Sequence, residues 1–215
     1  TQIIQPNSNQ VGYFNIANNT GANAFPIDNG IVMCANYVQD VLPSQTGGNP
    51  NTTTTPADPE LAGILAQIGS AGYAINDMVE IDFSFIATSD SIQFNYVFAS
   101  HEYAGYTCSN FNDVFGFFVS GPGISGGYNS PIGYPNGAEN FAVVPGTSIP
   151  ITITSINATG YSPTSCTNSY ASYFVPNSTA SGIASHYTTI MEVEFVVQPC
   201  QTYNFTMAIA DGSDG

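Results

Sequence analysis

The sequence predicts an all-β protein, an antiparallel β-sandwich of jelly-roll type with one short helix and long loops. Apolar and polar residues alternate with a period of two in several segments, which places apolar side chains on one face of each strand, as a sandwich requires. Segments rich in Gly, Pro, Asn and Thr separate them. The 215 residues are 43 % apolar and contain neither an internal repeat nor a linker, so we expect one domain over residues 1–215.

Six segments are the expected strands. In the first, Val79, Ile81 and Phe83 alternate with Glu80 and Asp82. The expected strands cover residues 79–85, 92–98, 113–119, 149–153, 191–197 and 203–209. The polar segments 43–56, 121–140 and 157–185 are long loops, and loops of this length in a compact domain are usually functional or tied down by a disulfide or an ion.

One helix is predicted in the first half of the chain. Asp58 suits the N-cap, Pro59 suits the first turn, and Gly69 and Gly72 end the helix. Apolar residues recur at i, i+3, i+4 and i+7: Leu61, Ile64, Leu65 and Ile68. We expect this helix to pack across one open end of the sandwich.

The charge balance limits the partners and points to a cofactor. The chain has no Lys or Arg against 15 Asp and Glu. Binding to nucleic acid or to an anionic membrane surface needs positive charge, so both partners are excluded. No carboxylate can be neutralised by Lys or Arg within the chain, and calcium is the cation best matched to carboxylate, amide and carbonyl oxygens. We therefore expect calcium as a cofactor.

The sequence also favours an exported protein with disulfides. No apolar run reaches the ~20 residues of a membrane helix, so we expect no membrane insertion. Thr1 is not an initiator Met, and we expect an export signal that was removed or omitted. The four cysteines, Cys34, Cys108, Cys166 and Cys200, contain no C-x-x-C pair, which argues against zinc. Their even number favours two disulfides in an oxidising compartment; connectivity stays open, with a preference for Cys108–Cys166 because both lie in long loops.

The predicted calcium ligands lie near strand ends. They are Glu102, Asn112, Asp113, Asp211 and Asp214. Calcium needs six to eight oxygens, usually from loops. In the alternative interpretation, Asp113 caps a turn and Asp211 is a solvated residue at the chain end.

Tyrosines crowd the predicted loops. The main candidates for a ligand or protein interface are Tyr103, Tyr106, Tyr128, Tyr134 and Tyr161. Exposed tyrosines beside amides suit a glycan platform or a protein interface, because one end of the ring is apolar and the other is polar. The alternative is that these rings pack the loops.

No catalytic residue is assigned. Glu80 with Asp82, and Glu192 with Glu194, could be paired glycosidase carboxylates, but the spacing favours the solvated face of a strand. His101 lies beside Glu102, yet the nucleophile motif G-x-S-x-G is absent. We expect a non-enzymatic protein.

The central segment resembles a known family. Its motifs are FNYVFAS at 94–100, HEY at 101–103 and CSNFNDVFGFFVSGPG at 108–123. Further matches follow in order: AVVPGTSIP at 142–150, HYTT at 186–189, PCQTY at 199–203 and AIAD at 208–211, with GIVM at 30–33 before them. These residues resemble the choice-of-anchor L domain. His101 departs from the family by standing where an acid is common, and the family continues past Asp211 into a further strand.

The resemblance implies a surface-displayed module of bacterial surface and secreted proteins, many of them from Bacteroidota that use type IX secretion. We expect a secreted or cell-surface module that mediates adhesion or self-assembly, in an appendage or filament, with calcium stabilising it. Its partners would be copies of itself, other surface proteins or glycans, and a neighbour's strand could complete a sheet edge. The alternatives are a lectin-like carbohydrate-binding module and, third, a glycosidase or esterase.

Overall fold

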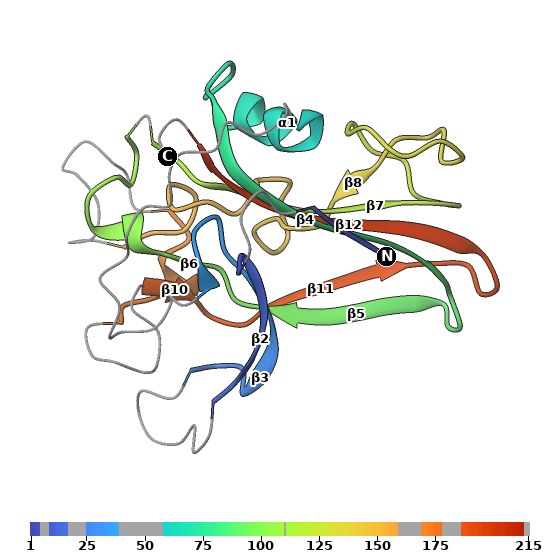
Figure 1. Ribbon diagram of the computed structural model, residues 1–215, viewed down its shortest axis with the longest axis horizontal. Coiled ribbons are helices and arrows are strands. Elements are labelled where there is room, and N and C mark those ends of the chain that lie inside the picture. The colour runs from blue at the N-terminus through green and yellow to red at the C-terminus, as the bar shows by residue number, and fades with distance from the viewer. Residues whose placement is uncertain are drawn as a thin grey trace.

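The computed structural model (Figure 1) describes residues 1–4, 9–16, 25–38, 58–109, 111–158, 169–177 and 186–212. Strand pairs in these segments are antiparallel, and the strands form two layers that face each other. The predicted antiparallel β-sandwich with one short α-helix and long loops is confirmed for the described residues.

The first layer is a five-stranded sheet. Its order is β1 (Gln2–Ile4), β4 (Ile75–Ile86), β12 (Thr202–Gly212), β7 (Val114–Ser120) and β8 (Glu139–Asn140). The second layer contains β11 (Met191–Val196) paired with β5 (Ser91–Tyr96), and the small sheet β6 (Ala99–Ser100), β10 (His186–Thr188) and β9 (Phe174–Val175). The 3₁₀ helices η2 (His101–Ala104) and η3 (Ala171–Tyr173) lie in the connections.

Aromatic rings fill the space between the two layers. The ring centroid of Phe94 on β5 lies 5.0 Å from that of Phe117 on β7 and 5.3 Å from that of Phe205 on β12. Phe83 on β4 stacks on Phe205 at 5.2 Å. Such large side chains dominate the energetics of a core. The period-two alternation that predicted β4, β5, β11 and β12 therefore also identified the core.

The helix α1 (Pro59–Gln67) begins at the predicted cap. The Asp58 carboxylate oxygen Oδ1 accepts a hydrogen bond from the Leu61 backbone N–H at 2.7 Å, which satisfies one of the donors that a helix leaves unpaired in its first turn. After the helix the chain turns at Gly69, whose φ of 87° suits glycine. In the described part of the chain, no helix has the length and apolarity needed to cross a membrane.

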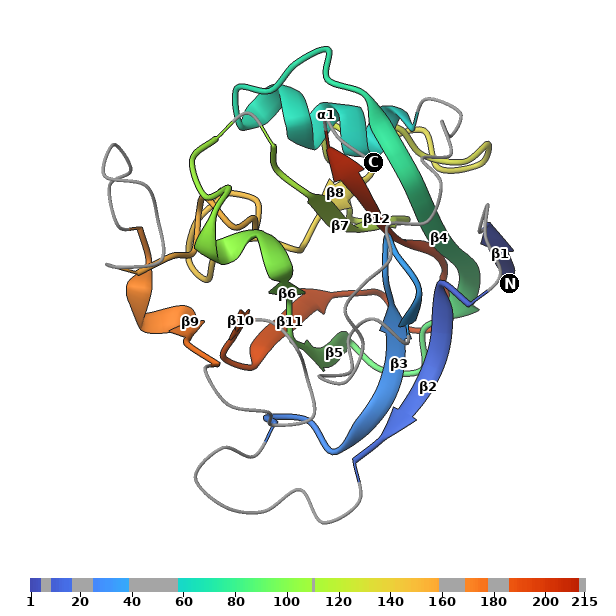
Figure 2. The same cartoon turned by 60° about the vertical axis from the view of Figure 1, so that its left-hand side comes forward.

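The position expected for α1 was wrong. The helix does not close an open end of the sandwich but lies on the outer face of the five-stranded sheet (Figures 1 and 2). Leu61, Ile64 and Leu65 are fully buried there. The residues beneath them are Val114, Phe118, Ala208 and Ala210. Gly116 explains the close approach, because a Cβ at this position would lie 2.9 Å from Ile64 Cδ1.

A separate hairpin of β2 (Val11–Asn15) and β3 (Asn29–Met33) lies on the side of the molecule away from α1 (Figures 1 and 2). Gln10, which is fully buried, ties the hairpin to β4: its side-chain amide donates to the Ala35 carbonyl at 2.9 Å and to the Asp77 carbonyl at 2.8 Å. Asp77 has a φ of 50°, and the β4–β12 register shifts at this point.

Residues 149–153 do not form the predicted strand. Pro150 makes a single bridge to Val143, and proline has no N–H for a longer ladder. The Thr152 hydroxyl oxygen accepts hydrogen bonds from the backbone N–H groups of Thr154 and Ser155, at 3.2 and 3.1 Å, which turns the chain. Ile151 and Ile153 are fully buried at this turn, whereas Ile149 is 39 % exposed.

Candidate functional site

The outer face of the five-stranded sheet is polar in the area that α1 does not cover, next to Glu60 in the first turn of the helix. On this face, antiparallel pairing places Asp82 of β4 opposite Thr206 of β12, and Thr206 opposite Phe118 of β7. The next row across the same strands is Ser84, Asn204 and Ser120. Residues far apart in the chain thus form one continuous polar surface, because side chains of paired residues lie on the same face.

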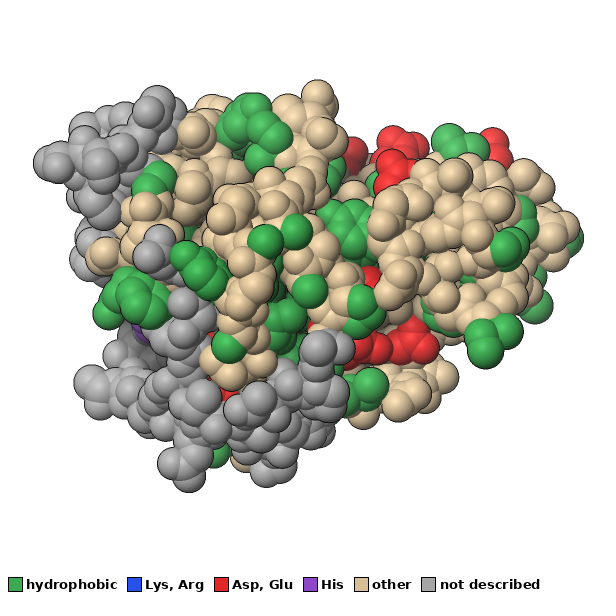
Figure 3. Space-filling view, turned by 90° about the horizontal axis from the view of Figure 1, so that it is seen from above, with side chains coloured by type: hydrophobic (Ala, Val, Ile, Leu, Met, Phe, Trp, Pro, Cys, Tyr) green, Lys and Arg blue, Asp and Glu red, His purple; other side chains and the backbone are tan. Residues whose placement is uncertain are grey.

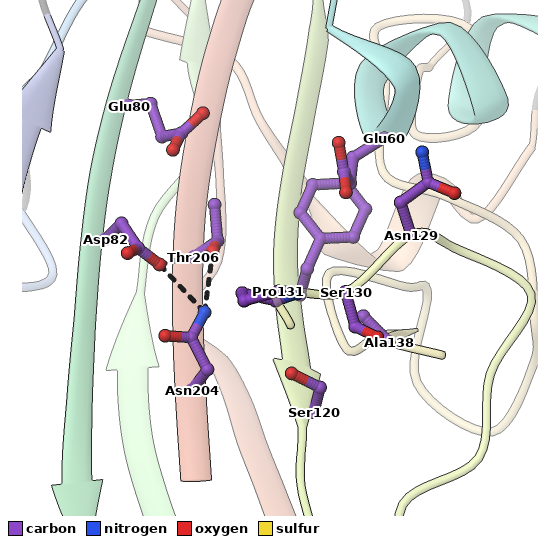
Figure 4. Close-up of a pocket in the computed structure, with 11 residues that line it drawn as sticks. Glu60, Glu80, Asp82, Ser120, Asn129, Ser130, Pro131, Ala138, Asn204 and Thr206 are labelled. Carbon is purple, nitrogen blue, oxygen red and sulfur yellow. Dashed lines mark hydrogen bonds between the residues drawn. The ribbon is translucent and has the colours of Figure 1, made fainter. Parts of the chain in front are cut away.

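A pocket of about 290 Å³ lies over this surface. The sheet forms its floor, Glu60 of α1 closes one side, and the β7–β8 loop (residues 121–138) closes the other (Figure 4). Its lining residues are Glu60, Glu80, Asp82, Phe118, Ser120, Asn129, Ser130, Pro131, Ala138, Asn204 and Thr206. Seen from the side of α1, acidic side chains lie along a hollow in the surface (Figure 3). We call this cavity the acidic pocket.

Hydrogen bonds fix the floor of the acidic pocket. The Asp82 oxygen Oδ1 accepts from the Asn204 side-chain amide and from the Thr206 hydroxyl, each at 2.8 Å (Figure 4). The Asn204 carbonyl oxygen in turn accepts from the Ser84 hydroxyl at 3.1 Å. Because both bonds to Asp82 end on Oδ1, its second oxygen is the acceptor that the floor offers to a ligand.

The acids beside the pocket raise each other's pKa. Burial raises the pKa of Glu80 from 4.5 to about 7, with further contributions from the negative charges of Asp58, Asp82 and Glu60. Burial also raises the pKa of Asp58, whose side chain is hydrogen-bonded to Glu80, and that of Glu60. The chain has no Lys or Arg that could offset these charges. Glu80 is therefore an acid whose protonation changes near neutral pH, well above the range of an exposed carboxyl.

The arrangement presents hydrogen-bonding groups in fixed positions beside apolar surface. Asp82 and Glu80 supply carboxylate acceptors, and the exposed Pro131 supplies apolar surface. The amide of Asn204 and the hydroxyl of Thr206 donate within the floor and hold Asp82 in place. A ligand with several hydroxyl groups matches such a surface, whereas a phosphate or carboxylate would be repelled.

Glu80 and Asp82 lie on the outer face of β4, as expected, but they are half-buried and line the half-enclosed pocket, so they are not fully solvated. The equivalent interpretation was right for Glu192 and Glu194, which are exposed on β11. Sequence reasoning did not single out Glu60, Asn204 and Thr206. Asn204 and Thr206 are polar positions of an alternating segment and Glu60 lies in the first turn of the predicted helix, but the strand register and helix packing that bring them together cannot be read from one sequence.

Three of the predicted calcium ligands lie around a different cavity. Glu102, Asp113 and Asp211 line it together, and the Ser100 hydroxyl donates to Asp113 at 3.4 Å. Asn112 is buried, and its backbone N–H donates to the Gly212 carbonyl at 3.3 Å. Asp214 lies outside the described residues. Within the described segments, no three His, Cys, Asp or Glu side chains are grouped so that they could hold a metal ion, and the calcium site stays a prediction.

The tyrosine candidates separate into different environments. Tyr103 is fully buried and packs against Phe174 with ring centroids 5.0 Å apart, so its assignment to an interface was wrong; burial raises its pKa. Tyr128 packs on Phe118 and donates from its hydroxyl to Gln67 of α1 at 2.9 Å. Tyr134 is half-buried in the β7–β8 loop. Tyr106 is 46 % exposed, and Tyr161 lies outside the described residues.

The prediction of two disulfides was wrong. Cys34 and Cys200 are present as thiols, so the four cysteines do not form two disulfides. Cys108 is disulfide-bonded. Cys166, the preferred partner, lies outside the described residues, so the preferred pairing stays a prediction.

Comparison with known proteins gives one match. The whole chain, residues 1–215, matches the family described as the Choice-of-anchor L domain. No curated protein and no solved structure matches the chain. The acidic pocket is therefore interpreted from its own geometry.

Proposed function

Because this chain belongs to the Choice-of-anchor L domain family, which indicates a cell-surface module, we propose that it is a non-enzymatic adhesion module that binds neutral glycans in the acidic pocket. The observation that supports this proposal most is the floor of the pocket, where Asp82, Asn204 and Thr206 form one hydrogen-bonded unit on a rigid sheet. Groups held in fixed positions before binding lose little conformational entropy when a ligand arrives.

The size of the pocket suits one sugar residue. Its volume of about 290 Å³ lies at the small end of the range for ligand pockets, which is about 300–1,000 Å³. A sugar offers hydroxyl groups around its ring and apolar C–H faces above and below it. The hydroxyl groups fit the carboxylates of Asp82 and Glu80, and the C–H faces fit Pro131, since Phe118 is only 2 % exposed.

The charge of the pocket gives the expected specificity. Glu60 and Asp82 repel a ligand carboxylate, and Glu80 adds a further negative charge as the pH rises through about 7. Sugars that carry a carboxylate or sulfate should therefore be rejected, and sugars with hydroxyl or amine substituents should be accepted.

A glycan array tests the proposal. The wild-type protein should bind neutral glycans and reject acidic ones. Asp82→Asn and Thr206→Val should each weaken binding by about tenfold or more, because each removes a hydrogen-bonding group from the floor. Glu194→Gln is the matched control, since it removes one negative charge from an exposed position on β11. Binding that is equal in the control and in the two pocket variants would contradict the proposal.

Self-assembly is a second candidate function. In the described residues, β1 is the outermost strand of the five-stranded sheet and pairs with β4, while its Ile3 and Ile4 are 50 % and 37 % exposed. An exposed edge strand is a template for pairing with another chain. Sedimentation at increasing concentration of wild type and of Ile3→Lys tests this: assembly of the wild type that the variant loses would support it, and a monomer at all concentrations would refute it.

A further inference from the structure

A second cavity, of about 630 Å³, lies inside the molecule on the side away from α1. The β2–β3 hairpin forms one wall, the inner face of β7 and β12 forms another, and the segment from Phe94 to Glu102 forms the third. We call it the hairpin cavity. It is separate from the acidic pocket, because the two cavities face opposite sides of the five-stranded sheet and share no lining residue.

Most of the wall of the hairpin cavity is apolar. The hairpin contributes Phe14 and Val32, the sheet contributes Phe115 and Met207, and β5 contributes Phe94. A cavity of this size and lining falls within the range that binds small organic molecules, and burial of apolar ligand surface in it is favourable. The body of a ligand should therefore be a hydrocarbon chain or ring.

One end of the cavity is acidic. Ala210 pairs with Val114 on the outer face, so the next residues in the ladder, Asp211 and Asp113, both face the inner layer. Glu102 of η2 lines the same cavity. All three acids are half-buried.

The acidic side chains at this end of the cavity indicate that the polar group of a ligand should be positively charged. The chain has no Lys or Arg, and His101 is the basic side chain among the described residues that line the cavity. A protonated amine placed among half-buried carboxylates forms strong charge-assisted hydrogen bonds, whereas a ligand carboxylate would be repelled there.

We propose that the hairpin cavity binds a small amphipathic amine, with its apolar chain among the aromatic side chains and its ammonium group at the end of the cavity that Glu102, Asp113 and Asp211 line. This proposal is independent of glycan binding at the acidic pocket.

The test uses three probes with the same hydrocarbon chain: decylamine, decanol and decanoate, each titrated below its micelle concentration at pH 7 by calorimetry. Decylamine should bind, decanol should bind at least about tenfold more weakly, and decanoate should not bind, because losing a charged hydrogen bond costs about that factor. Equal affinity for the three probes, or no binding of decylamine, would overturn the proposal.

Variants locate the binding. Asp211→Asn and Glu102→Gln should each weaken decylamine binding by about tenfold and leave decanol binding unchanged. Ala99→Phe, at a lining position of β6, should weaken both probes by filling the cavity. Glu194→Gln should change neither. Thermal melting of each variant checks folding. If Asp211→Asn or Glu102→Gln folds and binds decylamine with unchanged affinity, the ammonium group does not bind at the acidic end and the proposal is refuted.

Discussion

The cluster of Asp58, Glu60, Glu80 and Asp82 should make the stability of the protein depend on pH in a way that one substitution removes. The pKa of Glu80 is raised from 4.5 to about 7, so folding favours the protonated form. The protonation of Glu80 therefore makes its full contribution to the free energy of unfolding below about pH 4.5. This contribution is lost as the pH rises through about 7. Glu80→Gln keeps a neutral side chain at all pH values and should remove that loss.

The size of the effect follows from the shift and from exposure. The difference between 4.5 and about 7 corresponds to at most about 3.5 kcal/mol, at about 1.4 kcal/mol per pH unit. Glu80 is partly exposed, so solvent screening reduces the figure to about 1–2 kcal/mol. For a chain of this size, 1 kcal/mol corresponds to about 2–4 °C in the melting temperature. Glu80→Gln should therefore raise Tm by about 3–6 °C at pH 8 and by about 1 °C at pH 5.

Thermal unfolding followed by circular dichroism at pH 5 and pH 8 measures this difference. Glu194→Gln is again the control, because it makes the same chemical change at an exposed position and should shift Tm equally at both pH values. A gain from Glu80→Gln that is equal at pH 5 and pH 8, or a lower Tm at pH 8, would refute the reasoning about the cluster.

Three further changes test the fold and the cofactor. Gly116→Ala should destabilise the protein by about 1–3 kcal/mol in urea unfolding, because the added Cβ would crowd the ring of Phe118 and Ile64 of α1, and a neutral effect would contradict the close packing. Gln10→Ala should cost about 1–3 kcal/mol and speed hydrogen exchange in the β2–β3 hairpin first, since it leaves two buried carbonyl groups without their donor; unchanged exchange would count against this anchor. Adding calcium at 100 times its dissociation constant should stabilise the protein by about 2.7 kcal/mol if the predicted ion binds, and a Tm that chelator does not change would dispose of it.

Local signals in the sequence predicted local structure well. The cap at Asp58, the apolar spacing of Leu61, Ile64 and Leu65, and the alternation in β4, β5, β11 and β12 all depend on neighbouring residues, and the structure confirms them. The same logic failed at residues 149–153, where the hydroxyl groups of Thr152 and Ser155 turn the chain and compete with a strand.

The site could not be predicted in the same way because it depends on pairing between distant segments. Asp82 and Thr206 meet through the β4–β12 register, and α1 lies beside them because Gly116 and Ala208 leave room on that face. The absence of Lys and Arg led to the calcium prediction, which stays a prediction, and the acids whose pKa burial raises, Asp58, Glu60 and Glu80, are not the residues chosen as ligands. Tyr103 was misassigned because a loop tyrosine and a core tyrosine look alike in one sequence.

A crystal structure of the protein with a neutral glycan selected from the array tests the central claim most directly. The account predicts a sugar ring over Thr206, with hydroxyl groups within about 3 Å of the carboxylates of Asp82 and Glu80. A glycan bound elsewhere, such as beside Tyr106, with the acidic pocket filled only by solvent, would contradict it.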